Sequence, residues 1–127
     1  MKVIFLLSID KVVRVGKLFS FYSSLLTERQ QEFVRLYYHH DLSLGEIAEQ
    51  QGISRQAVYD NLKRSEEALE EYESKLNLVK YYDNMKDELD RLKDLLDNIE
   101  AELKDKESKE LRDILSRLQA YQEGELM

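Results

Sequence analysis

The sequence predicts an all-α protein, in which a helix-turn-helix is followed by long amphipathic C-terminal helices. Three observations support this fold class. The 127 residues include no proline and only four glycines, so few residues interrupt a helix. Charged residues make up 35% of the chain, and apolar residues recur at intervals of three and four, the spacing of one helix face. No segment has the alternation expected of a strand.

Two helices are expected before the helix-turn-helix. Apolar residues at helical spacing predict the first over residues 12–26. Thr27 and Gln30 stand at the spacing of a capping box, which predicts a second helix from about Glu28 to His39. Five aromatic residues of these helices could stack on bases, but their helical spacing favours packing in the core: Phe19, Phe21, Tyr22, Tyr37 and Tyr38.

The helix-turn-helix is predicted over residues 43–62, SLGEIAEQQGISRQAVYDNL. Ser43 and Glu46 form a second capping-box pattern. Gly52 supplies a residue with positive φ that ends the first helix, and Ser54 caps the next one. Such a second helix can lie in the major groove of DNA.

The exposed face of this second helix carries the candidate nucleic-acid-binding residues. Because Val58 must point to the core, the opposite face presents Arg55, Gln56, Tyr59, Lys63 and Arg64. Arg and Gln in the first turn can each pair with a base edge through two hydrogen bonds. Lys63 and Arg64 suit phosphates.

Acidic residues follow this face directly, and they argue against DNA binding: Glu66, Glu67, Glu70, Glu71 and Glu73. Glu66 lies roughly 16 Å along the helix axis from Arg55, at about 1.5 Å per residue. A helix that enters a groove by its N-terminal end could keep these carboxylates at the edge of the duplex.

The C-terminal part is expected to form long helices, because no residue forces a stop between Ser54 and Gly124. The seven-residue rhythm slips at residues 80–83 and restarts at Tyr82. Residues 104–110, KDKESKE, have no apolar side chain and predict a turn or hinge before a last helix over residues 111–121. The apolar stripe needs a partner. We expect homodimerisation through Met85, Leu89, Leu92, Leu96, Ile99 and Leu103, with an intramolecular bundle as the alternative.

Three segments follow from this organisation. Residues 1–10 are an N-terminal extension, residues 11–75 form the helix-turn-helix domain, and residues 76–127 form a C-terminal helical dimerisation element. The apolar run within Met1–Ser8 is shorter than the core of a signal peptide and much shorter than a membrane span. With no cysteine in the chain, these features predict a cytoplasmic protein without membrane insertion.

Composition also limits the function. The formal net charge of −7 means that any contact with nucleic acid must be local. No nucleotide-binding glycine loop, nucleophile elbow or zinc spacing occurs, so we expect no enzyme activity, catalytic residues, cofactor or metal. His39, His40 and Asp41 could be read as a metal cluster, but adjacent histidines at a helix end point apart. A favourable interaction with the helix C-terminus is the simpler role for them.

Residues 25–69 resemble region 4 of bacterial sigma factors, in the run from LTERQ through EIAE and GIS to the recognition helix. A wider resemblance starts at VGKLF (residues 15–19) and includes LTERQ, SLGEIAE, GISRQAVYDN and the following EEYE. On these motifs the chain resembles the YlxM family of helix-turn-helix proteins. The resemblance implies a cytoplasmic, all-helical regulatory component of the signal recognition particle pathway, without known enzyme chemistry.

Three functions stay open at this point. The first is a regulator that binds the particle's RNA or its GTPase subunit through the Arg55 helix. The second is a dimeric transcriptional regulator that reads a DNA site. The third is a protein–protein adaptor that has kept the fold but does not bind nucleic acid.

Overall fold

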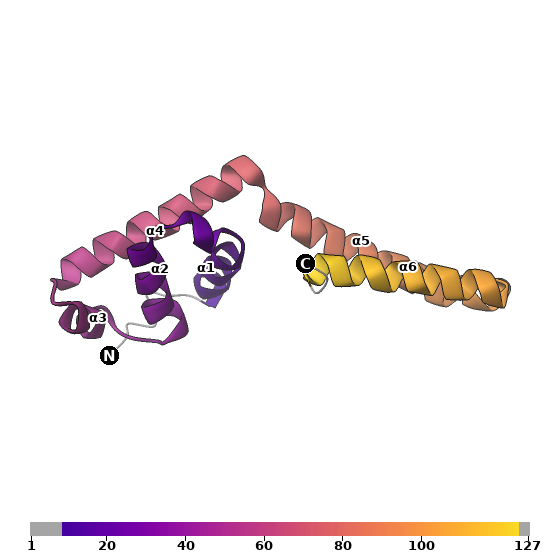
Figure 1. Ribbon diagram of the computed structural model, residues 1–127, viewed down its shortest axis with the longest axis horizontal. Coiled ribbons are helices and arrows are strands. Elements are labelled where there is room, and N and C mark those ends of the chain that lie inside the picture. Colours follow the sequence, from indigo (N-terminus) through magenta and orange to yellow (C-terminus); the bar gives the residue numbers. More distant parts are fainter. Residues whose placement is uncertain (1–8, 125–127) are drawn as a thin grey trace. The chain divides into compact units, whose positions relative to one another are not determined.

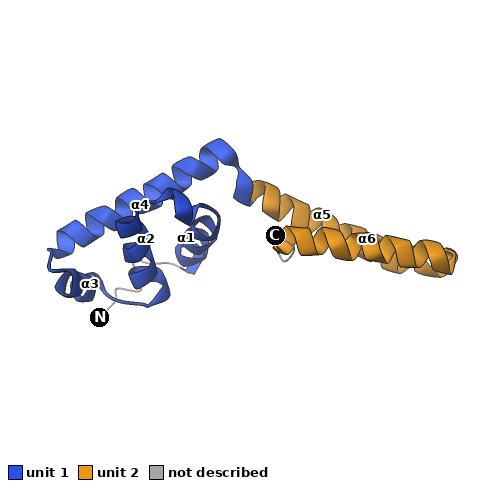
Figure 2. Ribbon diagram, viewed as in Figure 1, with its two compact units in different colours: residues 1–79 blue, residues 80–127 orange. Residues whose placement is uncertain are grey.

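The computed structural model describes residues 9–124, and over these residues the protein is all-α. The helices are α1 (Ile9–Tyr22), α2 (Glu28–Val34), α3 (Leu44–Gln51), α4 (Arg55–Leu76), α5 (Leu78–Ile99) and α6 (Asp105–Glu123), shown in Figure 1. The chain forms two compact units, residues 1–79 and residues 80–127 (Figure 2). The predicted extension over residues 1–10 lies outside the described residues except for its last two positions.

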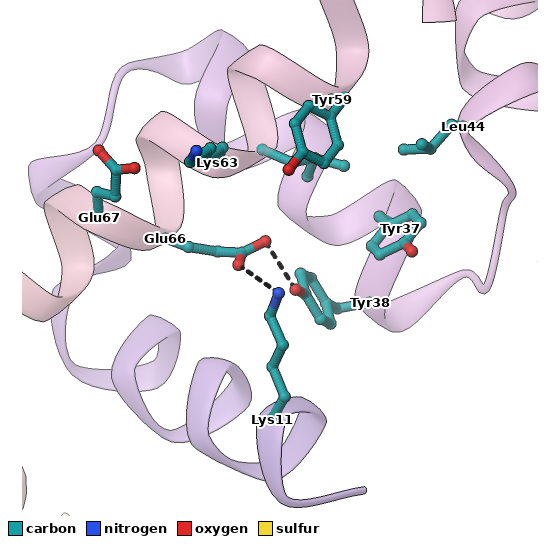
Figure 3. Close-up of a pocket in the computed structure, with 9 residues that line it drawn as sticks. Lys11, Tyr37, Tyr38, Leu44, Tyr59, Lys63, Glu66 and Glu67 are labelled. Carbon is teal, nitrogen blue, oxygen red and sulfur yellow. Dashed lines mark hydrogen bonds and ion pairs between the residues drawn. The ribbon is translucent and has the colours of Figure 1, made fainter. Parts of the chain in front are cut away.

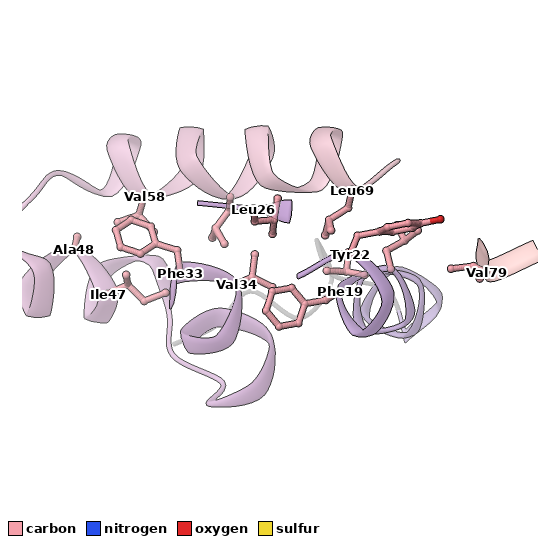
Figure 4. Close-up of a cluster of buried hydrophobic side chains, with 13 residues drawn as sticks. Phe19, Tyr22, Leu26, Phe33, Val34, Ile47, Ala48, Val58, Leu69 and Val79 are labelled. Carbon is pink, nitrogen blue, oxygen red and sulfur yellow. The ribbon is translucent and has the colours of Figure 1, made fainter. Parts of the chain in front are cut away.

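The first unit is built around α4, which packs against α1, α2 and α3. Figure 4 shows side chains of α4 directed at those of the three shorter helices. Val58, Leu62 and Leu69 lie one or two turns apart on the inner face of α4, and all three are buried. The fully buried residues facing them include Leu18, Tyr22, Phe33, Val34 and Ile47. Burial of this apolar face is what fixes which side of α4 remains open to solvent.

Both predicted capping boxes are confirmed. Thr27 Oγ1 accepts a hydrogen bond from the Gln30 amide while the Gln30 side chain accepts one from the Thr27 amide. Ser43 and Glu46 repeat the arrangement at the start of α3. Each box satisfies two amides that a helix N-terminus leaves without a partner, so each fixes where its helix begins.

The second predicted helix is shorter than residues 28–39. An α-helix covers Glu28–Val34, and the chain then widens into a π-helical turn, Arg35–His39, closed by a hydrogen bond from the His40 amide to the Arg35 carbonyl. The first helix also ends early, at Tyr22, and a 3-10 turn over Ser23–Leu25 follows it. The wider turn places Tyr37 and Tyr38 partly buried against the core.

The helical run after Ser54 is first interrupted at a single residue. Asn77 adopts a left-handed conformation with φ of 55° and ends α4, so the break precedes the predicted slip at residues 80–83. Asparagine is one of the few non-glycine residues that tolerates this conformation, because its short polar side chain can bond locally.

A buried polar network stabilises this break. The Tyr22 hydroxyl donates to Glu73 Oε1 at 2.5 Å, and the same carboxylate oxygen accepts the Val79 amide at 3.0 Å. The Leu78 amide in turn donates to the Tyr22 hydroxyl oxygen at 3.1 Å. The first amides of α5 therefore find their acceptors inside the first unit, where water cannot reach them easily.

The second unit is an antiparallel hairpin of α5 and α6. The Gln122 side chain donates to the Tyr82 carbonyl near one end, and Arg112 pairs with Asp97 and Glu100 towards the other. The turn occupies residues 100–104, with a 3-10 segment at Glu100–Glu102. The expectation of a turn over residues 104–110 is therefore wrong, because most of this polar segment forms the first turns of α6, where its side chains are exposed. No helix among residues 9–124 is long and apolar enough to cross a membrane.

Candidate nucleic-acid interface

The corner between α3 and α4 has the predicted helix-turn-helix geometry. Gly52 has φ of 67°, and its amide bonds back to the last turn of α3. Ser54 Oγ accepts a hydrogen bond from the Ala57 amide at 3.0 Å and so caps α4. Ile53 packs against the core between the two helices. The first turn of α4 thus lies at the surface, and the amides of that turn that Ser54 does not cap are at the exposed end of the helix.

The five candidate residues on α4 are all exposed, whereas Val58 and Leu62 are buried. Tyr59 is 48% exposed. Gln56 is already engaged, because its side-chain nitrogen donates to Asp60 Oδ1 at 2.9 Å. The same nitrogen carries a second N–H, so Gln56 can donate to a base edge and keep the bond to Asp60.

The Arg55 guanidinium lies over the first turn of α3. A Cβ added at Gly45 would meet the guanidinium nitrogens of Arg55 at 3.0 and 3.1 Å. The absence of a side chain at Gly45 therefore makes room for the Arg55 head group. Because of this contact, Arg55 presents its charge at the junction of α3 and α4.

The charges on α4 are divided along its length. Among the described residues, Arg55, Lys63 and Arg64 form no ion pair or side-chain hydrogen bond. The carboxylates that follow are mostly occupied: Glu66 pairs with Lys11 at 3.0 Å, Glu70 with Arg14 at 2.8 Å, Glu71 with Lys75 at 3.0 Å, and Glu73 is buried. The first three turns of α4 thus carry three unpaired cations and one carboxylate, Asp60, which accepts a bond from the neutral Gln56 side chain, while three of the five glutamates that follow pair with neighbouring cations.

Residues 9–115 match the family model UPF0122, described as "Putative helix-turn-helix protein, YlxM / p13 like". The chain belongs to the UPF0122 family. The UPF0122 protein YlxM of Bacillus subtilis is 52% identical over 89 residues, which is 70% of this chain and 81% of that protein. A UPF0122 protein of Halalkalibacterium halodurans is 53% identical over 89 residues, 70% of this chain and 82% of its own length. One from Bacillus mycoides is 46% identical over 110 residues, 87% and 98% of the two chains.

Membership of UPF0122 agrees with the all-α helix-turn-helix described above and makes nucleic-acid binding plausible for this chain. It suggests a regulatory protein rather than an enzyme. Within residues 9–124 of this UPF0122 protein, no group of three or more His, Asp or Glu side chains could hold a metal ion. His39 contacts Phe19 edge-on, with ring centroids 5.6 Å apart.

The residues predicted to dimerise this UPF0122 protein divide into two groups. Leu89 and Leu96 are buried against Leu115 of α6, and Leu103 packs partly against the same cluster. Met85, Leu92 and Ile99 are 54%, 47% and 46% exposed. The hairpin therefore covers one edge of the predicted stripe with α6 and leaves the other edge open.

Sequence reasoning did not find the two cations of α1 that neutralise the acidic run. Lys11 and Arg14 lie more than 50 residues from the carboxylates they contact. The sequence offered one signal, the spacing of the charges. Lys11 and Arg14 are three residues apart and share a face of one helix, and Glu66 and Glu70 are four residues apart and share a face of another. This match of two helix faces becomes meaningful only when α1 is known to lie beside α4.

Proposed function

We propose that this UPF0122 protein is a non-enzymatic regulatory protein that binds nucleic acid through the first three turns of α4. One observation supports this most: Arg55, Lys63 and Arg64 are exposed and pair with no described carboxylate, although acidic residues follow them immediately. Three exposed cations in the first three turns of a helix, with Arg55 beside the amides of its N-terminus, suit the phosphates of a nucleic-acid backbone.

We propose the signal recognition particle as the target, in the cytoplasm, on the strength of the family resemblance. In this proposal the basic face of α4 contacts the particle's RNA or its GTPase subunit and regulates the particle. The chain's net charge of −7 disfavours non-specific attraction to RNA, so the local arrangement of charge has to select the contact.

The test is a binding titration of the full chain with the particle's RNA, followed by fluorescence anisotropy at several salt concentrations. If three phosphates are neutralised, affinity should fall roughly 20- to 40-fold between 50 and 200 mM salt. The triple variant Arg55→Ala, Lys63→Ala, Arg64→Ala should bind weakly and with a shallower salt dependence. The matched control removes three exposed lysines of the second unit, Lys93, Lys106 and Lys109, and should bind like the wild type. Equal affinity of the two triple variants would contradict the proposal.

The same variants separate the alternatives. A transcriptional regulator would prefer one DNA sequence over a scrambled one, and Arg55→Ala would reduce that preference more than it reduces overall binding. An adaptor would keep its affinity for the GTPase subunit in the triple variant, because phosphate contacts would play no part.

We also propose that the hairpin of α5 and α6 pairs with a second copy of the chain. Each helix buries only a narrow edge against the other, through Leu89, Leu96 and Leu115. The remaining apolar side chains stay exposed: Met85, Leu92, Leu95 and Ile99 on α5, and Leu111, Ile114, Leu118 and Tyr121 on α6. At 100° per residue, both exposed strips lie on the same side of an antiparallel pair.

An antiparallel hairpin with such a face is half of a four-helix bundle, and a two-fold axis would set each face against its equivalent. Leu92→Asp or Ile114→Asp should convert dimers to monomers in light scattering, because a carboxylate would be buried in the interface. Val13→Asp, at a position 59% exposed on α1, is the matched control. A mass that stays unchanged in both interface variants would rule out this pairing.

A further inference from the structure

A cavity of about 360 Å³ opens beside the basic face of α4. Its apolar wall consists of Tyr37 and Tyr38 from the π-helical turn, Tyr59 and Leu62 from α4, and Leu44 from the start of α3. Figure 3 shows the side chains of Tyr37, Tyr38, Tyr59 and Leu44 around one space. The volume lies at the lower end of the range for small-molecule sites, which are typically apolar with a few polar groups.

The charged groups of the cavity balance one another. Lys11 and Lys63 stand against Glu66 and Glu67. Glu66 is held from two sides, by the Lys11 ammonium at 3.0 Å and by the Tyr38 hydroxyl at 2.8 Å (Figure 3). Burial and this carboxylate raise the pKa of Tyr38 far above its ordinary value, so its hydroxyl remains a donor. A lining of zero formal charge favours a neutral ring over a phosphate or a free cation.

Two groups at the mouth of the cavity remain available to a ligand. Tyr59 is half-exposed, and neither it nor Lys63 has a hydrogen bond or ion pair with any described residue. They are four residues apart on α4, so the Tyr59 ring and the Lys63 ammonium lie on the same side of the helix. Arg64 follows Lys63 at the surface. An aromatic face therefore stands directly beside the cations that suit phosphates.

We propose that this cavity receives one unpaired nucleobase, which stacks on Tyr59 while the phosphates beside it contact Lys63 and Arg64. The inference rests on the proposed nucleic-acid binding and specifies its substrate class: a single-stranded segment such as an RNA loop, rather than a continuous duplex. A paired base is enclosed in the helical stack and cannot enter a cavity, whereas loop bases can be splayed out and stacked on aromatic side chains. Glu67, exposed at the rim, can accept a hydrogen bond from an exocyclic amino group.

The test uses the full chain and two RNAs with the same nucleotides. One is a hairpin with 2-aminopurine in its loop, and the other is fully paired. The wild type should bind the hairpin more tightly and quench the fluorescence of the probe by stacking. Tyr59→Leu should abolish the quenching and weaken binding of the hairpin roughly 5- to 150-fold, the range for loss of one stacked base. Tyr59→Phe should keep both properties.

The matched control is Tyr81→Leu, since Tyr81 is 59% exposed and lies in the second unit. Both sites are open to solvent, so circular dichroism should show that each variant is as helical as the wild type. The cavity inference is overturned if Tyr59→Leu binds the hairpin as the wild type does, or if it loses affinity for the GTPase subunit alone.

The outcomes separate this inference from the function on which it rests. If the chain binds hairpin and duplex equally, and binding depends on Arg55, Lys63 and Arg64 but not on Tyr59, the inference fails and the proposed function stands. If no RNA or DNA binds in a salt-dependent manner, the proposed function itself fails.

Discussion

The substitution Tyr22→Phe should destabilise the first unit strongly, although it removes a single oxygen. The Tyr22 side chain is fully buried and Glu73 is 7% exposed. Without the hydroxyl, the Glu73 carboxylate loses its 2.5 Å donor, and the Leu78 amide loses its acceptor. A hydrogen bond to a charged group is worth about 1.5–3 kcal/mol, and an unsatisfied amide adds about 1 kcal/mol. We expect a loss of about 2.5–4 kcal/mol.

Amide hydrogen exchange measures this loss in the first unit alone. Core amides of α4 that exchange only through unfolding of the unit should exchange roughly 70- to 900-fold faster in the variant. The control is Tyr72→Phe, which removes a more exposed hydroxyl that donates to the Leu25 carbonyl at 3.1 Å, a neutral bond worth about 1 kcal/mol. If Tyr22→Phe accelerated exchange no more than Tyr72→Phe does, the buried network would not stabilise the fold as argued.

Three further predictions follow from the same structure. Ser54→Ala should lower the free energy of unfolding by about 1 kcal/mol in urea denaturation, and Ser54→Asp should lower it less, because a carboxylate can also cap α4. Burial raises the pKa of Tyr22 and Tyr38 above 10.0. The stability that these two buried phenols contribute is therefore complete below pH 10, and it declines above pH 10 as the same phenols ionise in the unfolded chain. Ultraviolet titration should show these two phenols ionising after the exposed ones. Arg112→Met should raise the pKa of Glu100, now lowered mainly by hydrogen bonding to Arg112, back towards 4.5 in a carboxyl NMR titration.

The helix-turn-helix could be predicted from the sequence because its signals are local. A capping box needs only Ser43 and Glu46, three residues apart, and the corner needs only Gly52 and Ser54. Hydrogen bonds within one turn of chain determine where α3 and α4 begin, whatever surrounds them. For the same reason the inner positions, Val58 and Leu62 among them, followed from helical spacing.

The break at Asn77 could not be predicted in the same way. Asn77 sits between two stretches with good helical spacing, and an asparagine there is compatible with a continuing helix. What ends α4 is the surrounding structure. The Tyr22 hydroxyl, which is 51 residues from Glu73 in the sequence, donates to the Glu73 carboxylate and accepts the hydrogen bond of the Leu78 amide at the start of α5. A buried glutamate also looks like one more member of an acidic surface until its partners are known.

The candidate site was predictable in part. Helical spacing gives the outer face of α4, but the contact of Arg55 with Gly45 and the bond from Gln56 to Asp60 depend on side-chain conformations that spacing does not determine. The cavity depends on contacts between residues that are farther apart in the sequence. The π-helical turn after Val34 places Tyr37 and Tyr38 beside the same cavity as Tyr59. No turn signal in the sequence predicts a π-helical turn.

The acidic run on α4 shows why net charge is a poor guide to the partner of this chain. At physiological ionic strength the field of an exposed charge decays over about 8 Å, and Glu66 lies roughly 16 Å along the helix from Arg55. Lys63 and Arg64 are within one turn of Glu66, so for them it is the pairing of the carboxylates that limits the repulsion. Glu66 and Glu70 are moreover compensated by Lys11 and Arg14 of α1. A phosphate near the start of α4 would therefore interact mainly with the local cations. At 0.01 M salt the decay length grows to about 30 Å, and repulsion from the remaining acids would then oppose the attraction.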